Sequence, residues 1–336
     1  MKNWIITAFA GLAFLSAGAA ASAQTIKLGT LAPKGSPWFD NLQDMASDWG
    51  EASNGRIKVR IYPGGSIGDE QDMVRKMQIG QLQGAVLTAE GLSIIVPEVL
   101  ALQMPMIFKT DGELDYARDA LKPELEALFE ARGYKILNWG DIGWVRLFAR
   151  DPAITVEDLG KQKLFTWAGD PELAEGYKMQ GFNVVPLPVP EIFSGLQSGL
   201  IDALFAAPVA ALSYQWFGIA NNMAELKVLK LIGATVVTQK TWNKIKPEVR
   251  DDVLAAAIQA GNNAREKIRN FEDEAIRVMQ EHGLTTHPVS AEEAADWEKS
   301  ARSSWVVYTS SNVPAELVER VEALRDEYRK QQATAN

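Results

Sequence analysis

Two long extended segments constrain the fold of this chain of 336 residues more than any other feature. Residues 134–149 and 226–238 are apolar and rich in β-forming residues, and the first is longer than a usual strand. A strand of that length can cross from one domain into another. Because a block with its own alternation of strand and helix patterns lies between them, we expect an inserted lobe and a first lobe that is discontinuous in sequence.

Strand and helix patterns alternate on both sides of the first long segment. Before it, the hydrophobic periodicity indicates strands at 26–30, 56–62 and 84–88 and helices at 36–55, 69–80 and 111–132. After it, the same signals indicate strands at 163–167, 183–187 and 201–205 and helices at 171–180 and 191–198. This alternation predicts an α/β fold with right-handed crossovers.

Helical spacing dominates the last part of the chain. From Pro247 it continues for roughly ten turns, and shorter helices are expected at 291–307 and 314–330. We therefore predict a two-lobe α/β protein. Its parts are a signal peptide at 1–23, lobe I at 24–149 plus 231–270, lobe II at 150–230, and C-terminal helices at 271–336 that pack across the lobes.

The first residues have the order of a secretory signal peptide. A positively charged start at Lys2 is followed by an apolar stretch and by Ala21-Ser22-Ala23, the small-residue pattern of a cleavage site. The apolar stretch is too short for a membrane-spanning helix. We therefore expect cleavage near Ala23 and a mature protein in the periplasm.

The composition is poor in catalytic and metal-binding side chains. The chain has no Cys and only two His, His282 and His287. This excludes disulfides, thiolate metal sites and Cys nucleophiles, and leaves little for a Ser-His-Asp triad. A net charge of −9 argues against nucleic acid as a partner. We expect neither a metal nor another cofactor, although any two of the 43 acidic residues could form a glycosidase-type pair.

Aromatic residues crowd the segments that would border a cleft between the lobes. They are Trp139, Trp144, Phe148, Phe165, Trp167, Phe205, Trp216 and Phe217, with Arg146 and Arg150 interleaved. Ligand pockets are mostly apolar with a few placed polar groups, so these residues are candidates for a binding site. Core packing is the alternative, and for any single aromatic residue it is the commoner fate.

Four collinear motifs resemble those of one protein family. They are YPGGSIGDE at 62–70, LQMPMIF at 102–108, DLGKQKL at 158–164 and LQSGLIDA at 196–203. On these motifs the chain resembles the extracytoplasmic solute-binding subunits of TRAP (tripartite ATP-independent periplasmic) transporters, of the DctP type. The similarity covers essentially the whole mature sequence.

The resemblance implies a periplasmic binding-protein fold of two lobes with a long helix across both. It also implies a receptor, not an enzyme, that closes around a small organic acid and delivers it to a membrane permease. Glu90 matches a family position near the ligand, and Trp38 lies on the first loop beside the cleft. Arg146 matches a second family arginine after a one-residue insertion, which makes it the candidate anchor for an anionic group.

Two family residues are replaced. The Asn that usually follows the fourth motif corresponds to Ala206 or Ala207. The carboxylate-binding arginine that follows the third motif corresponds to Phe165, and an aromatic ring cannot substitute for a bidentate guanidinium. For Arg146, a purely structural role is the alternative to an anchor. We expect a ligand with a sizeable apolar or aromatic portion, and the predicted binding residues are Trp38, Glu90, Trp144, Arg146, Phe165, Trp167 and Phe205.

Residues 144–146, 165–167 and 208–217 are most similar to a divergent branch of the family in which a TPR-repeat protein accompanies the transporter. The partners expected from the resemblance are therefore the ligand, the permease subunits and a TPR-repeat periplasmic protein. Two other functions stay open. One is an exported enzyme on the same two-lobe scaffold, and the other is a periplasmic carrier of hydrophobic ligands.

Overall fold

The computed structural model describes residues 23–311 and 313–335, so the predicted signal peptide up to residue 22 lies outside the described residues. The strands follow the order β2-β1-β3-β9-β4-β7-β5-β6, with β8 beside β4 and β10 beside β8. Their bounds are β1 (Gln24–Thr30), β2 (Ile57–Tyr62), β3 (Gly84–Thr88), β4 (Tyr134–Ala149), β5 (Lys163–Trp167), β6 (Asn183–Leu187), β7 (Ala203–Ala206), β8 (Asn222–Ala224), β9 (Leu229–Thr238) and β10 (Thr285–His287).

The long strand β4 joins the two ends of this sheet. It pairs antiparallel with β9 between Tyr134 and Val145, and with β7 between Arg146 and Ala149. Parallel pairing links β1 to β2 and β3, and links β5 to β6 and β7, as the alternation of strands and helices predicted. Below, β2, β1, β3 and β9 are called the first half of the sheet, and β7, β5 and β6 the second half. The residue boundaries of the two lobes stay a prediction.

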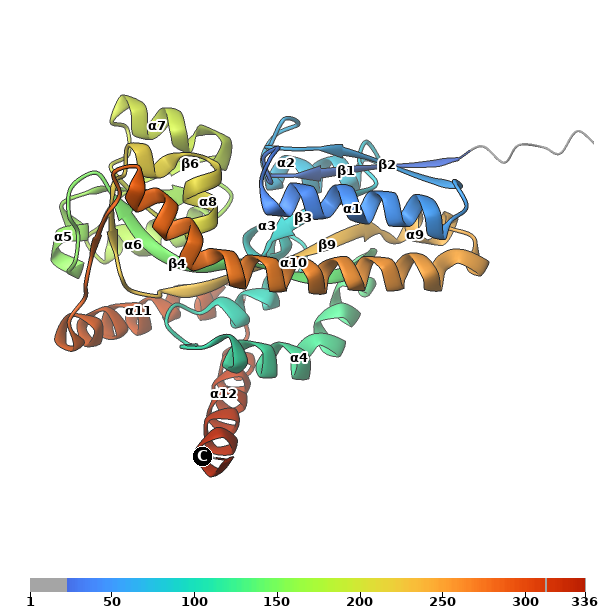
Figure 1. Ribbon diagram of the computed structural model, residues 1–336. Helices are drawn as coiled ribbons and strands as arrows, with labels where there is room; N and C mark the ends of the chain where they lie inside the picture. The colour runs from blue at the N-terminus through green and yellow to red at the C-terminus, as the bar shows by residue number, and fades with distance from the viewer. Residues whose placement is uncertain (1–22, 312, 336) are drawn as a thin grey trace, which may run out of the picture.

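Helices cover both faces of the sheet (Figure 1). Their bounds are α1 (Pro37–Ala52), α2 (Glu70–Gln78), α3 (Ala89–Ser93), α4 (Asp111–Ala131), α5 (Val156–Gly160), α6 (Pro171–Met179), α7 (Ile192–Ser198), α8 (Pro208–Ser213), α9 (Gln239–Lys244), α10 (Pro247–Glu281), α11 (Ala291–Ser311) and α12 (Ala315–Ala335), with the 3-10 turns η1 (Pro97–Gln103), η2 (Val189–Glu191) and η3 (Trp216–Gly218). Short elements such as α3, α5, β8 and β10 have no counterpart in the sequence prediction. The long helix after Pro247 is confirmed as α10, with 35 residues.

The helix α10 extends along both halves of the sheet, and it contacts α1, β4 and α8 (Figure 1). At Gly261 it approaches β4 so closely that a Cβ there would lie 2.7 Å from the Cβ of Asn138. Helix α1 begins where the sequence indicated, because Ser36 caps it and Pro37 fixes its first turn. It packs Trp49 against Ile26 and the apolar face of α10 in the core of the first half.

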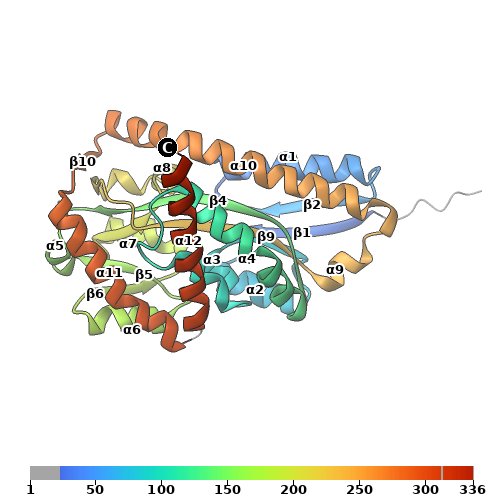
Figure 2. The same ribbon diagram turned by 90° about the horizontal axis from the view of Figure 1, so that it is seen from below.

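The C-terminal helices lie on the other side of the sheet (Figure 2). Helix α11 contacts α5 and α6, beside the second half, and α12 contacts α4 and η1, beside the first half. Both continue a few residues beyond the predicted ends. Tyr308 of α11 is buried in the same apolar cluster as Val321 of α12, so these helices are part of the packed structure.

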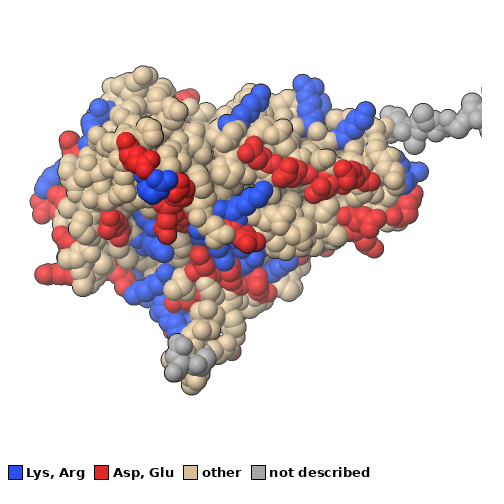
Figure 3. Space-filling view, in the orientation of Figure 1, with Lys and Arg blue, Asp and Glu red and all other residues tan. Residues whose placement is uncertain are grey.

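Charges of both signs alternate over the face seen in Figure 3. Acidic side chains run along α1, where Asp40, Asp44, Asp48 and Glu51 are exposed. Across the described ranges, no helix contains an apolar stretch long enough for a bilayer crossing.

Candidate ligand-binding site

A cavity of about 300 Å³ lies between the two halves of the sheet. The first half contributes residues of β3 and the loop after β1, the second half contributes β5, β7 and α8, and β4, β9 and α10 complete it. Its volume is at the lower end of the range for small-molecule sites. Among the predicted binding residues, Trp38, Glu90, Phe165, Trp167 and Phe205 line this cavity.

The lining is mostly aliphatic and aromatic. Its large apolar members include Leu31, Leu87, Ile142, Val145, Phe165, Val189, Ile192, Phe205, Trp216, Leu229 and Leu231. The ring of Tyr214 stacks on that of Trp216, with the ring centroids 4.6 Å apart. Gly169 stands against the Trp167 indole, and a Cβ there would lie 2.2 Å from the ring, so only glycine leaves room for it.

Apart from the tyrosines, the ionisable side chains that line the described cavity are all carboxylic acids. They are Glu70, Glu90, Asp141 and Asp170, and none of the described lining residues is Lys, Arg or His. Asp141 forms an ion pair with Arg269, whose Nε lies 2.7 Å from Asp141 Oδ2. The cavity therefore presents carboxyl groups, hydroxyl groups and apolar surface to a ligand.

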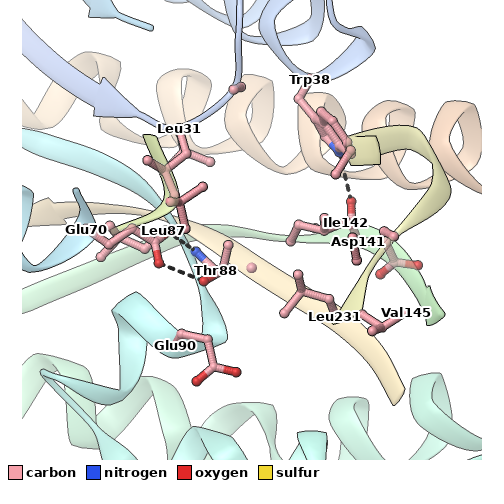
Figure 4. A pocket seen from close by; sticks show the side chains of 18 of the residues that line it. Leu31, Trp38, Glu70, Leu87, Thr88, Glu90, Asp141, Ile142, Val145 and Leu231 are labelled. Atoms are coloured by element: carbon pink, nitrogen blue, oxygen red, sulfur yellow. Dashed lines mark hydrogen bonds between the residues drawn. The ribbon is translucent and has the colours of Figure 1, made fainter. Parts of the chain in front are cut away.

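The carboxyl group of Glu70 accepts its hydrogen bonds from residues in its own half of the sheet. Its Oε1 accepts from the backbone N–H of Thr88 at 2.6 Å and its Oε2 accepts from Thr88 Oγ1 at 2.7 Å (Figure 4). Burial raises the pKa of Glu70 to about 7 despite these hydrogen bonds.

Glu90 points away from the Glu70–Thr88 pair (Figure 4). Its Oε1 accepts from Gln103 Nε2 at 3.3 Å, and Gln103 is in turn held by the N–H of Ile232, which donates to Gln103 Oε1 at 2.9 Å. Burial, followed by the negative charges of Asp170 and Glu70, raises the pKa of Glu90 to about 8. Near neutral pH this carboxyl group is mostly protonated in the absence of a cation.

Two tyrosines complete this part of the lining. Burial raises the pKa of Tyr177 to about 12 and that of Tyr308 well above its ordinary value, and the charges of Glu90 and Asp170 contribute to both. Their hydroxyl groups therefore stay protonated and can donate hydrogen bonds to a ligand. Neither tyrosine was predicted, because α6 and α11 are distant in sequence and only the fold brings them to the cavity.

Three side-chain contacts close the cavity by joining the two halves of the sheet. Trp167 Nε1 donates to Asp69 Oδ2 at 2.6 Å, and the N–H of Val189 donates to the same oxygen at 3.3 Å. The hydroxyl of Tyr214 donates to the carbonyl oxygen of Leu31. Asp69 also caps α2 through its other oxygen, which accepts from the N–H of Glu70 at 2.9 Å.

Trp38 reaches the cavity from the first turn of α1. Its Nε1 donates to the backbone carbonyl of Asp141 at 3.3 Å, which ties α1 to the middle of β4 (Figure 4). Its indole is therefore held in place by the protein itself, and its apolar surface is available to a ligand.

Trp144 and Arg146 are not among the residues that line the cavity, contrary to the expectation from sequence. Successive side chains of a strand point to opposite faces, and on β4 it is Val145 that faces the cavity. Trp144 Nε1 donates to Asp111 Oδ1 at 2.9 Å, and Arg146 Nη1 lies 2.6 Å from Glu272 Oε1. This ion pair is consistent with the structural alternative for Arg146, and the choice between that role and an anchor stays a prediction.

Arg146 belongs to a buried network of ion pairs. Lys230 Nζ lies 3.0 Å from Asp111 Oδ1 and 3.9 Å from Glu272 Oε2, and it stands over the Trp144 ring. This network joins β4, β9, α4 and α10 where the two halves of the sheet meet. The basic side chains nearest to the cavity are therefore already paired with acidic ones.

A sheet that is shared between two halves, a long helix across both and a cavity between the halves are the features of the periplasmic binding-protein fold. A family model described as bacterial extracellular solute-binding protein, family 7 (DctP), matches residues 28–311. The chain belongs to this family of TRAP-transporter binding proteins, whose members are periplasmic receptors and not enzymes.

Individual relatives agree with the assignment. The chain is 23% identical over 236 residues to the 2,3-diketo-L-gulonate-binding periplasmic protein YiaO of Escherichia coli K12, covering 70% of this chain and 72% of that protein. It is 21% identical over 286 residues to the sialic acid-binding periplasmic protein SiaP of Vibrio cholerae, covering 82% and 88%. A TRAP periplasmic solute-binding protein of Xanthobacter autotrophicus Py2 with bound β-D-galacturonate has the same fold, with a TM-score of 0.82, 19% identity and coverage of 90% and 99%.

Proposed function

We propose that this protein is the solute receptor of a TRAP-type secondary transporter and that its ligand has a sizeable apolar or aromatic portion. The apolar lining of the cavity is the observation that supports this ligand. Phe165 and Trp167 stand on β5, where the resemblance places a carboxylate-binding arginine. An apolar group gains about 25 cal/mol for each Å² that it removes from water. A strongly hydrated dicarboxylate would lose its water without gaining a guanidinium partner.

The relatives support an organic acid as the ligand, since galacturonate, sialic acid and 2,3-diketo-L-gulonate are all acids. In this chain the acid group would be held by neutral donors such as the hydroxyls of Tyr177, Tyr308 and Thr166, which line the cavity. Closure of the two halves around the ligand would then present the receptor to the permease.

Thermal unfolding with a panel of acids tests this proposal. A ligand that binds only the folded protein raises the Tm, and at equal concentration the ligand with the lower Kd raises it more. We expect 3-phenylpropionate to raise the Tm more than succinate or galacturonate at equal millimolar concentration. A larger shift with succinate or galacturonate would overturn the apolar ligand. Native mass spectrometry of protein purified without denaturation would identify any solute that the cavity retains.

The permease partner follows from the family, and we propose a TPR-repeat periplasmic protein as an additional partner. The similarity of 208–217 to the TPR-associated branch supports it. Binding of the purified TPR-repeat protein from the same source organism, measured with and without ligand, tests this partner.

A periplasmic carrier of hydrophobic ligands remains the second candidate, and uptake that does not depend on the permease genes would favour it.

A further inference from the structure

We propose that the ligand bears a protonated nitrogen, an ammonium group, which lies against Glu90 at the carboxyl-rich end of the cavity. This proposal rests on the proposed function, because it concerns the ligand of the same cavity. It specifies a group of the ligand that the proposed function leaves open.

The first observation is the imbalance of charge at the cavity. Among the described residues, Glu90 forms no ion pair with a Lys, Arg or His, and its hydrogen bond comes from the neutral amide of Gln103. Asp170 lines the cavity as well, and its Oδ1 accepts from the N–H of Leu173 at 2.9 Å. The nearby basic side chains Arg146, Lys230 and Arg269 all face acidic partners in the network behind β4.

The second observation is that aromatic residues line the cavity together with the two carboxyl groups. Tyr177 and Tyr308 line the same cavity as Glu90 and Asp170. A cation over the face of an aromatic ring is attracted by the ring's negative face, and the attraction is stronger where water is excluded. Carboxylates with aromatic neighbours and no basic side chain form a suitable surface for an organic ammonium group.

The third observation is an unsatisfied polar atom. Thr166 is 5% exposed and lines the cavity between Phe165 and Trp167 on β5. Its Oγ1 has no hydrogen-bond partner within the described structure. Buried hydroxyl groups nearly always have one, so this atom indicates that a polar group of a ligand completes the site.

The electrostatics favour a cation over an additional anion. Glu90 and Asp170 repel each other when both are ionised, and this repulsion contributes to the raised pKa of Glu90. A protonated nitrogen between them would neutralise that repulsion, whereas a carboxylate placed there would increase it. Because Glu90 follows β3 of the first half and Asp170 follows β5 of the second, the same nitrogen would also favour closure.

Three phenyl compounds test how much the protonated nitrogen contributes to affinity apart from the rest of the ligand. L-phenylalanine differs from 3-phenylpropionate only by its amino group, and 2-phenylethylamine lacks the carboxyl group. By titration calorimetry of the mature protein, we expect L-phenylalanine or 2-phenylethylamine to bind at least about tenfold tighter than 3-phenylpropionate, the typical effect of one charge-assisted hydrogen bond.

The substitution Glu90→Gln keeps the shape of the side chain and removes its ability to ionise when a cation binds. It should weaken binding of the nitrogen-bearing probes by about tenfold or more and leave 3-phenylpropionate unchanged or tighter. The control Glu51→Gln removes one acidic charge from the exposed face of α1 and should change none of the three affinities. The ranking of probes on the unmodified protein does not depend on whether the Glu90 variant folds.

Different results would overturn the protonated nitrogen and the apolar ligand of the proposed function. If 3-phenylpropionate binds as tightly as both nitrogen-bearing probes, the protonated nitrogen is overturned while the apolar ligand stands. If none of the phenyl compounds binds at millimolar concentration, the apolar ligand is overturned, and the nitrogen with it. A Tm increase with Na⁺ or Ca²⁺ alone that matches the one with L-phenylalanine would assign the carboxyl groups to an inorganic cation and overturn the proposal.

Discussion

The indole Nε1 of Trp167 donates a 2.6 Å hydrogen bond to Asp69 Oδ2 and thereby joins the two halves of the sheet across the cavity. Trp167 ends β5, and Asp69 is the residue before α2, so the bond exists only when the halves are closed. Trp167 also lines the cavity. One side chain therefore contacts both the ligand space and the opposite half, which couples occupancy to closure.

Trp167→Phe should shift the protein toward an open form. It keeps an aromatic ring in the cavity but removes the donor to Asp69, at a cost of about 1 kcal/mol, or roughly a fivefold loss of affinity. Small-angle scattering should show a larger radius of gyration without ligand. The matched control is Trp297→Phe, which removes the donor to the Ile154 carbonyl at 2.7 Å. Equal effects of both substitutions on affinity would contradict the role of Trp167 in closure.

The raised pKa values of two cavity carboxyl groups predict a dependence of stability on pH. Glu70 and Glu90 titrate near 4.5 in the unfolded chain but at about 7 and about 8 in the folded protein. Between these values the folded protein holds protons that the unfolded chain has released. The free energy of unfolding should therefore fall as the pH rises from about 5 to about 8.

Thermal unfolding of the ligand-free protein across this range measures the effect. Glu90→Gln should flatten the upper part of the decline, because it removes the group with the higher pKa. Carboxyl groups such as Glu113 and Asp115 have lowered pKa values, and their contributions change only at more acidic pH. A Tm that stays constant or rises between pH 5 and 8 would show that the two cavity carboxyl groups are not protonated in the folded protein.

Phe165→Arg tests why this cavity differs from those of relatives with acidic ligands. A guanidinium at this position would lie in the same cavity as Glu90 and Asp170, and it could bind a carboxylate in a bidentate way. We expect measurable binding of succinate to appear and binding of phenyl compounds to weaken by about tenfold, because the phenyl ring loses its apolar contact. Phe165→Leu, which keeps the lining apolar, serves as the control for lost aromatic surface. Succinate binding that is equal in Phe165→Leu and Phe165→Arg would contradict this explanation.

The sequence was sufficient to predict the elements with strong periodicity, but it did not determine which face of β4 borders the cavity. The strand β4 and the helix α10 have long uninterrupted patterns, and both are found where expected. In β4, however, every residue from Gly143 to Ala149 is buried. With no alternation of polar and apolar residues, nothing distinguishes the face of Val145 from that of Trp144 and Arg146. This is why the predicted binding residues included Trp144 and Arg146, which pack behind the cavity.

The sequence alone could not identify the lining residues that come from distant segments, and the reason is a different one. Asp170, Tyr177 and Tyr308 line the cavity only because α6 and α11 pack beside its end, and no local pattern encodes such a contact. Glu70 is a partial exception, since it ends the motif at 62–70 that carried the family resemblance. Long-range packing therefore determines the polar part of this site, while the sequence alone indicated only some of its apolar lining, namely Trp38, Phe165, Trp167 and Phe205.

Arg146→Met tests the structural role of the ion pair with Glu272. Removing the guanidinium leaves the buried Glu272 carboxylate with only the N–H of Trp144 at 3.2 Å and the more distant Lys230. Loss of one partner from a buried pair costs about 3 kcal/mol or more, so chemical denaturation should show a clear loss of stability. The control Arg277→Met removes the exposed ion pairs with Glu274 and Glu281 and should cost less than about 1 kcal/mol. Because Arg146 does not line the cavity, ligand affinity should not change; a loss of affinity with unchanged stability would instead identify Arg146 as the anchor for an anionic group.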